Sequence, residues 1–134
     1  MPPPYDGAVR FAYATSATGR DLDADLPLLQ QAAERHGLTM VPARWDDPTV
    51  DWNDFDVVVV RSCWDYIDRR DEFLAWAERV PSLRNDARTL RWNTDKTYLR
   101  ELEDAGVRII STAWDVRTGD DLGDHAEWVV KPTI

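Results

Sequence analysis

Residues 56–66 read Asp56-Val57-Val58-Val59-Val60-Arg61-Ser62-Cys63-Trp64-Asp65-Tyr66. The four consecutive valines are β-branched, which favours a strand over a helix. Because the run is not interrupted by polar residues, we expect both faces of this strand to be covered. Strands of this kind are typical of parallel sheets flanked by helices, so the stretch predicts an α/β fold.

The residues before this stretch continue the α/β pattern. Apolar and aromatic residues predict strands over 9–14 and 39–43, and Asp23 or Asp25 can cap a helix between them. Pro42 lies inside the second strand and has no amide hydrogen for a ladder, so we expect that strand at an edge of the sheet. The order strand, helix, strand, strand indicates a doubly wound, Rossmann-like parallel sheet.

The residues after the stretch predict a second helix and a less regular remainder. Asp68 and Asp71 resemble a capping box for a helix that Pro81 ends. Beyond a loop, the apolar spacing predicts one more helix and two short strands, over 93–105, 107–110 and 127–130.

Composition excludes several classes of protein. The 134 residues carry a net charge of −9 and scattered basic residues, which argues against a nucleic-acid or anionic-membrane surface. Apolar runs such as Val57 to Val60 are far shorter than the roughly 20 residues of a membrane span. The single cysteine, Cys63, cannot form an internal disulfide, so we expect a reducing cytoplasm and a packing role for the thiol.

Lysine use singles out two positions. Arginine supplies 14 of the 16 basic residues, and the two lysines are Lys96 and Lys131. We expect Lys96 in the first turn of a helix, where a cation is unfavourable unless an anion compensates it. Lys131 follows an apolar segment and precedes Pro132, which favours extended backbone at the lysine. Each is therefore a candidate ligand for a phosphate group.

A second candidate site follows the valine run. Arg61, Ser62, Asp65 and Tyr66 lie where ligands of open α/β sheets bind, beyond the carboxyl end of a strand. A guanidinium, a hydroxyl and a carboxylate are suitable groups for a small zwitterion. The alternative is that Arg61 and Asp65 simply pair with each other.

These segments carry a resemblance to a known family. Three segments carry the resemblance: residues 55–66, Trp92-Asn93-Thr94-Asp95-Lys96-Thr97-Tyr98-Leu99 and Val129-Val130-Lys131-Pro132. In them the chain resembles the amino-terminal part of bacterial ATP-grasp proteins related to glutathione synthetase. The same group includes the ligase-like enzyme that closes the D-cycloserine ring. The resemblance implies a Rossmann-like pre-ATP-grasp domain over residues 1–88 and the truncated start of an ATP-grasp domain over residues 89–134.

The resemblance also implies a function. Such proteins are ATP-dependent carboxylate–amine ligases, in which ATP phosphorylates a carboxylate and an amine attacks the acylphosphate. By resemblance Lys96 and Lys131 hold ATP. The position of Arg61, Ser62, Asp65 and Tyr66 at the end of the valine strand, together with their chemistry, predicts contact with a small amino-acid-like substrate. The family's phosphate loop and magnesium ligands are expected outside this segment, so we expect no metal site and no catalysis from the segment alone. We also expect self-association, because strands near Trp114 and Trp128 lack covering elements.

Two other classes remain open at this point. A phosphoacceptor receiver module has a similar length and a Lys-Pro after its last strand, but it needs acidic residues at the ends of its first and third strands. Ala14-Thr15-Ser16 and Arg61-Ser62 stand there instead. The other alternative is a non-catalytic α/β interaction fragment.

Overall fold

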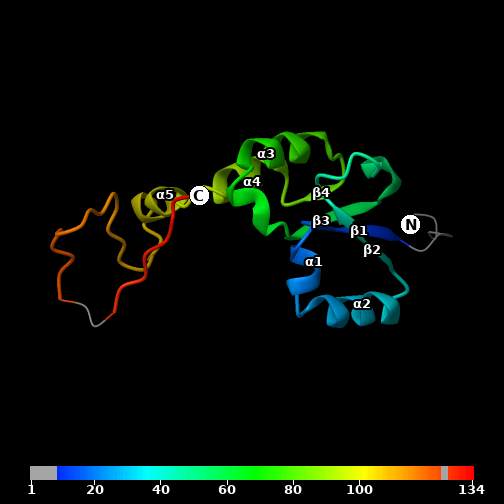
Figure 1. The fold of residues 1–134 in the computed structure, drawn as a ribbon, viewed down its shortest axis with the longest axis horizontal. Coiled ribbons are helices and arrows are strands. Elements are labelled where there is room, and N and C mark those ends of the chain that lie inside the picture. Colours follow the sequence, from blue (N-terminus) through cyan, green and yellow to red (C-terminus); the bar gives the residue numbers. More distant parts are fainter. Residues whose placement is uncertain (1–8, 125–126) are drawn as a thin grey trace. The chain divides into compact units, whose positions relative to one another are not determined.

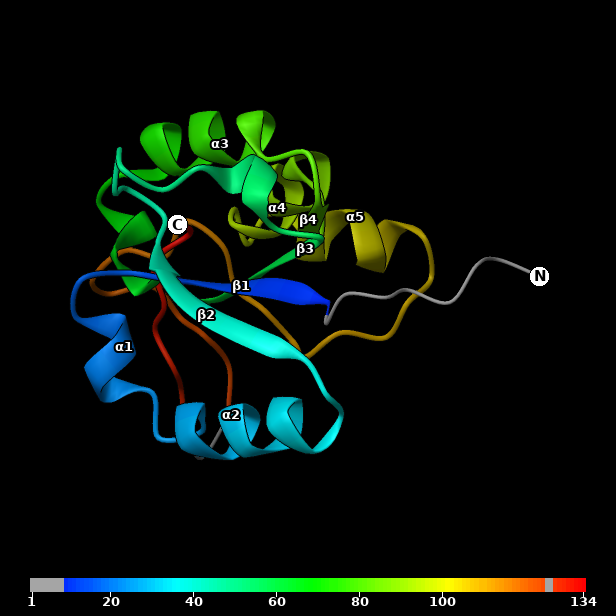
Figure 2. The same cartoon turned by 90° about the vertical axis from the view of Figure 1, so that its right-hand side faces the viewer.

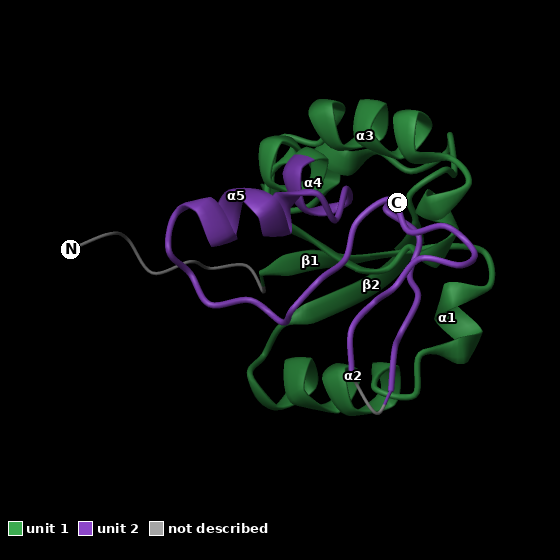
Figure 3. Cartoon of the chain, turned by 90° about the vertical axis from the view of Figure 1, so that its left-hand side faces the viewer, with its two compact units in different colours: residues 1–91 green, residues 92–134 purple. Residues whose placement is uncertain are grey.

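A computed structural model describes residues 9–124 and 127–134. The chain forms two compact units, residues 1–91 and 92–134 (Figure 3). Their assignment to a pre-ATP-grasp and an ATP-grasp domain stays a prediction. No helix in the described ranges is both long and apolar enough to cross a membrane.

The first unit is built on a parallel sheet of four strands, in the order β2-β1-β3-β4 (Figure 1). The strands are β1 (Arg10–Thr15), β2 (Thr39–Arg44), β3 (Val57–Ser62) and β4 (Leu83–Arg84). As predicted, β2 is an edge strand, and its Pro42 is in register with Tyr13 of β1. The two-residue β4 falls where the sequence predicted a loop.

Helices cover both faces of the sheet (Figure 2). One face carries α1 (Gly19–Leu22) and α2 (Leu26–Arg35), and the other carries α3 (Arg70–Arg79). Two 3₁₀ turns, η1 (Trp52–Asp54) and η2 (Trp64–Ile67), lie in the connections on either side of β3. The α/β, Rossmann-like architecture predicted from the sequence is confirmed.

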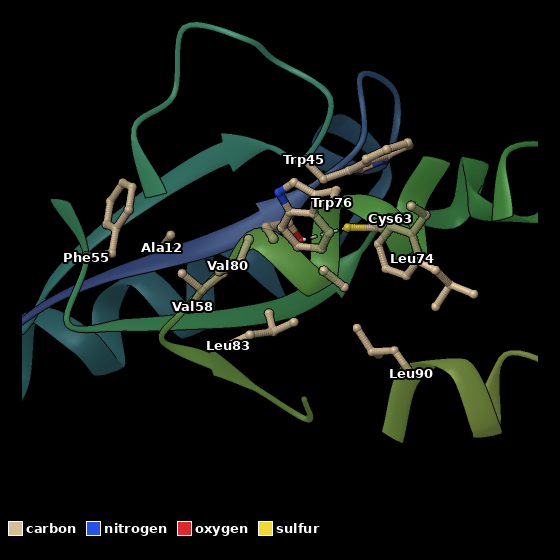
Figure 4. Packing of buried hydrophobic residues seen from close by; sticks show 13 residues of the cluster. Ala12, Trp45, Phe55, Val58, Cys63, Leu74, Trp76, Val80, Leu83 and Leu90 are labelled. Carbon is tan, nitrogen blue, oxygen red and sulfur yellow. Dashed lines mark hydrogen bonds between the residues drawn. The ribbon is translucent and has the colours of Figure 1, made fainter. Parts of the chain in front are cut away.

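An aromatic core fills the space between the sheet and α3 (Figure 4). Trp76 packs against Phe73, Trp52 and Trp45, with ring centroids 5.1 to 6.2 Å apart. Burying a side chain of this size contributes about 1.5–3 kcal/mol relative to exposing it. Ala12 and Val58 present the sheet side of the same cluster. The core therefore holds β1 and β3, which carry the candidate site, against α3.

The valine run is less buried than expected. Val58 is fully buried, whereas Val57, Val59 and Val60 are only half-buried. Helices do cover both faces of this strand, as predicted (Figure 2), but they leave three of the four valines partly accessible. The strand also extends to Ser62, so Arg61 and Ser62 belong to β3 and do not follow it.

Two capping predictions are corrected. The N-cap of α3 is Arg69 and not Asp68, which ends η2, so no capping box forms. Arg69 instead stacks on Trp45, 4.6 Å from the ring centroid, and donates to Asp46. Asp25 is the N-cap of α2, but its carboxylate makes no capping hydrogen bond with that helix.

The second unit has less regular structure than the sequence predicted. The expected helix over 93–105 is replaced by the end of α4 (Ala87–Asn93) and by α5 (Tyr98–Asp104). Lys96 precedes α5 and is not in its first turn. Gly106 ends this segment with a φ of 81°, as predicted. The predicted strands over 107–110 and 127–130 do not form, since these described residues belong to no helix or strand and pair with none of the four strands of the sheet.

Candidate functional site

A pocket of about 330 Å³ lies beside the carboxyl end of β3 and next to α1. Ligands of open α/β sheets bind at this end of the strands. The pocket has a charged part and an apolar rim, and its lining residues are Leu22, Asp23, Ala24, Asp25, Arg61, Ser62 and Trp64. The sequence prediction had included Arg61 and Ser62 but none of the acidic residues in this set.

A β-bulge brings Arg61 and Ser62 to the same side of the sheet. In the pairing of β1 with β3, Ala14 is opposite Val60 and Thr15 is opposite Ser62, so Arg61 is the extra residue. Neighbouring side chains of a regular strand point to opposite faces, whereas a bulge redirects one of them. As a result, both Arg61 and Ser62 contact the carboxylate of Asp23.

Asp23 is the centre of the polar network. Its Oδ2 accepts hydrogen bonds from the hydroxyls of Tyr13 and Ser62 and from Nε of Arg61, and its Oδ1 accepts one from the backbone amide of Asp25. These hydrogen bonds, led by the one from Ser62, lower the pKa of the Asp23 carboxyl to about 2. The carboxylate is therefore charged at neutral pH and acts as an acceptor for fixed donors.

Tyr13 is the buried member of the network around Asp23. Its side chain is fully buried on β1, and burial together with the hydrogen bond to Asp23 raises its pKa to about 12. The Tyr13 hydroxyl also lies within hydrogen-bond distance of Ser62 Oγ. Because neither Tyr13 nor Asp23 has a pKa near neutrality, the pair is suited to binding and orientation and not to general acid–base catalysis at neutral pH.

Arg61 does not pair with Asp65. Its Nε lies 3.4 Å from Asp23 Oδ2, and a terminal guanidinium nitrogen lies 2.5 Å from Asp25 Oδ2. The alternative of an Arg61–Asp65 ion pair is therefore wrong. Asp65 instead accepts a hydrogen bond of 2.9 Å from Trp45 Nε1. Tyr66 packs against Phe73 of the core, so neither Asp65 nor Tyr66 lines the pocket.

The backbone of Ser62 fastens the pocket to the loop after β1. The Ser62 carbonyl oxygen accepts hydrogen bonds of 3.1 Å from the amide and the hydroxyl of Ser16. Gly19 lies so close that a Cβ on it would be 1.9 Å from the same oxygen. The start of α1 is therefore held directly against β3.

Cys63 has a packing role. Its side chain is buried, and its sulfur donates to the Ala14 carbonyl at 3.3 Å. Burial, with the nearby charge of Asp65, raises the pKa of the thiol well above its usual range. A neutral, buried thiol is a poor nucleophile, in agreement with the sequence prediction.

The two lysines belong to the second unit, and the structure brings their segments together. The Thr133 carbonyl, two residues after Lys131, accepts a 2.8 Å hydrogen bond from the Lys96 amide. The Lys96 ammonium lies 3.5 Å from the same oxygen. Both lysine side chains are solvent-accessible.

Comparison with known proteins gives the family. The family described as D-cycloserine synthetase DcsG, N-terminal domain, matches residues 11–89, which include the whole pocket. The chain belongs to this family. Cycloserine biosynthesis protein DcsG from Streptomyces lavendulae is 37% identical over 136 residues, which cover 92% of this chain and 46% of that protein.

A solved structure supports the same assignment to the DcsG family. The crystal structure of D-cycloserine synthetase DcsG matches with a TM-score of 0.71 and 39% identity, over 75% of this chain and 35% of that one. The chain thus spans less than half the length of the relatives it matches. The names of these relatives describe a cycloserine biosynthesis protein and a D-cycloserine synthetase.

Sequence reasoning missed Tyr13, Asp23 and Asp25 in the DcsG-type domain. A usable signal existed, because β1 and β3 are adjacent and the loop after β1 must lie beside the end of β3. Asp23 and Asp25 follow that loop closely, yet their positions before a helix favoured an interpretation as caps.

Proposed function

We propose that this chain is the amino-terminal part of an ATP-dependent ligase that joins a carboxylate to an amine. In such a reaction the carboxylate takes the γ-phosphoryl group of ATP and forms an acylphosphate, which the amine attacks with release of phosphate. Membership of the DcsG family supports this proposal, and so does the name synthetase that its relatives carry. The activity is proposed for a protein that also has the part of DcsG that this chain does not match.

One structural observation carries the ATP part of the proposal. The hydrogen bonds between Lys96 and Thr133 bring together the segments of the only two lysines in the chain, which are 35 residues apart in sequence. A lysine ammonium is a point charge suited to phosphate oxygens, and phosphoryl transfer depends on such stabilisation. Lys96 and Lys131 are therefore the residues that would contact ATP.

Magnesium has no corresponding set of ligands here. In residues 9–124 and 127–134, no group of three or more His, Cys, Asp or Glu side chains is arranged to hold a metal ion. The magnesium that the ATP-grasp resemblance implies does not fit these residues, and we assign no step to it. The relation to glutathione synthetase likewise remains part of the proposal.

The pocket at Arg61 is the proposed place for a small amino-acid-like substrate. Arg61 offers donors for a carboxylate, while Ser62 donates to Asp23, which also accepts from Arg61 Nε, and so helps to hold the arrangement in place. Asp65 and Tyr66, which the sequence also suggested, face Trp45 and the core, so we leave them out of the proposed contacts. A receiver function lacks support, because Thr15, Ser16 and Ser62 occupy the strand ends that need carboxylates.

A chimera tests the lysines. The matching residues of Streptomyces lavendulae DcsG are replaced by this chain, and ATP-dependent product formation is measured with Lys96→Ala and Lys131→Ala. We expect each change to cost about 2–3 kcal/mol in kcat/KM for ATP, the scale of charged hydrogen bonds. Lys→Arg replacements should rescue poorly, because a planar guanidinium does not reproduce an ammonium.

Arg108→Ala is the matched control, since it removes one exposed positive charge from the same unit. ATP kinetics that are unchanged in both lysine variants would show that the lysines are structural. If the chimera is inactive, NMR titration of the 134-residue chain with ATP decides the question. Shifts at Lys96 and Lys131 support the proposal, and shifts confined to other residues contradict it.

A further inference from the structure

Arg61 lies between two carboxylates that differ in environment. Asp23 contacts its Nε and has a side chain only 6% exposed, whereas Asp25 contacts a terminal nitrogen and is 67% exposed. Solvent screens an exposed ion pair strongly, so such pairs contribute little, while a buried carboxylate acts at higher effective strength. The two acidic residues therefore have different effects on the same guanidinium.

Asp23 cannot turn away from Arg61. Its carboxylate also accepts from Tyr13 and Ser62, both of which are fully buried, and from the Asp25 amide at 3.0 Å. A rotation of the Asp23 side chain would break several of these hydrogen bonds at once. Asp23 thus fixes the position of the Arg61 Nε and, through it, the direction of the guanidinium.

Asp25 is held less firmly. Its carboxylate does not cap α2, although the residue occupies the N-cap position of that helix. It meets Arg61 at a terminal nitrogen, in the pocket that both residues line. A carboxylate entering the pocket would use these terminal nitrogens, so it would compete with Asp25 and not with Asp23.

We propose that Asp23 is a positioning residue that directs Arg61 toward a ligand carboxylate, and that Asp25 is a displaceable competitor for the same guanidinium. The proposal rests on the proposed function, which places a carboxylate-bearing substrate in this pocket. When such a ligand binds, its carboxylate takes the place of the Asp25 carboxylate on the terminal nitrogens of Arg61, and Asp25 turns toward solvent.

This arrangement predicts that two neighbouring acidic residues affect the affinity for a carboxylate in opposite directions. Neutralising Asp23 should weaken carboxylate binding, and neutralising Asp25 should strengthen it. General electrostatics predicts instead that removing any nearby negative charge favours an anion, and a purely structural role predicts weaker binding in both variants. Only the positioning arrangement gives opposite effects for two acidic residues two positions apart.

The test uses the 134-residue chain, labelled with ¹⁵N and titrated with D-serine. We expect Asp25→Asn to lower the Kd at least threefold and Asp23→Asn to raise it at least tenfold. Asp21→Asn, a matched change at an exposed acidic residue of α1, should stay within twofold. Serinol, which lacks the carboxylate, should not distinguish Asp23→Asn from the unmodified chain. Weaker D-serine binding to Asp25→Asn, or equal shifts in all three variants, would overturn the proposal.

A readout without ligand separates this inference from the proposed function. Solvent exchange of the Arg61 Nε–H should be slow in the unmodified chain and in Asp25→Asn, and fast in Asp23→Asn. If Asp23→Asn does not fold, Tyr13→Phe removes one donor to Asp23 at constant charge and should accelerate the same exchange. Exchange unaffected by the variant that folds would refute positioning by Asp23. Protected exchange without D-serine binding would count against the proposed substrate site alone.

Discussion

Replacing Gly19 with alanine tests how α1 is fastened to β3. An added Cβ would lie 1.9 Å from the Ser62 carbonyl oxygen and 2.7 Å from Ser16 Oγ. An ordinary contact of a Cβ needs about 3.4 Å, so the start of α1 must move away from Ser62 by about 1.5 Å. The neighbouring atom is backbone in the middle of the site, and it cannot rotate aside as a flexible side chain would.

The cost follows from the hydrogen bonds that this movement breaks. Gly19 donates to Ser16 Oγ at 3.0 Å, and Ser16 donates twice to the Ser62 carbonyl at 3.1 Å. Contacts of 3.0–3.1 Å lengthened by about 1.5 Å are no longer hydrogen bonds, and each contributes about 1 kcal/mol. Alanine recovers at most about 1 kcal/mol from its higher helix propensity. We therefore expect the free energy of unfolding to fall by about 2–3 kcal/mol.

Urea denaturation followed by tryptophan fluorescence measures this change. Gly37→Ala is a control for the substitution itself, because its Cβ would meet no atom within 4 Å but its φ is 66°. That backbone strain costs about 1–2 kcal/mol, less than the steric conflict at Gly19. If Gly19→Ala loses under about 0.5 kcal/mol, or loses less than Gly37→Ala, the close approach described here is wrong.

Three further predictions concern the core, the pH response and the second unit. Trp45→Phe should lower the free energy of unfolding in urea by about 1.5 kcal/mol more than Trp76→Phe does, and equal losses would contradict this. The reason is that Trp45 Nε1 donates to Asp65, whereas the buried Trp76 Nε1 has no partner in the described structure. The chain should lose stability as the pH falls from about 4 to about 2, because the Asp23 carboxyl, whose pKa is lowered from 3.8 to about 2 by its hydrogen bonds, becomes protonated and its network breaks. The Asp23→Asn variant should lose less stability over this range, and urea midpoints measured at both pH values would show the difference. The chain should self-associate in sedimentation experiments through its exposed apolar residues, and a monomer at all concentrations would contradict this. Val130 is 92% exposed, so Val130→Asp should reduce the association.

Local sequence patterns predicted the elements of the first unit well. The valine run and the proline in β2 have meanings that depend on a few neighbouring residues, so β3 and the sheet edge were predictable. The prediction of a strand over 107–110 was wrong because a strand depends on residues far away in the sequence. A strand needs a partner, and apolar periodicity alone does not say whether one is present.

The candidate site depends on tertiary contacts that local sequence patterns do not determine. Asp25 could cap α2 or pair with an arginine, and the competition is settled by Arg61, which arrives from a strand 36 residues later. The bulge is a property of the pairing between two strands and has no signature in either one. These two facts explain why Arg61 and Ser62 were predicted as site residues while their acidic partners were not.

The bulge at Arg61 also determines which insertions and deletions this region can tolerate. Removing any one residue between Val60 and Cys63 would restore a regular ladder with β1 and return the remaining side chains to strict alternation. The residue that remained would pair with Thr15 and face Asp23, whereas the other donor to Asp23 would be lost. In an alignment of related chains, a one-residue gap at this position would therefore mark the loss of one donor from the Asp23 network.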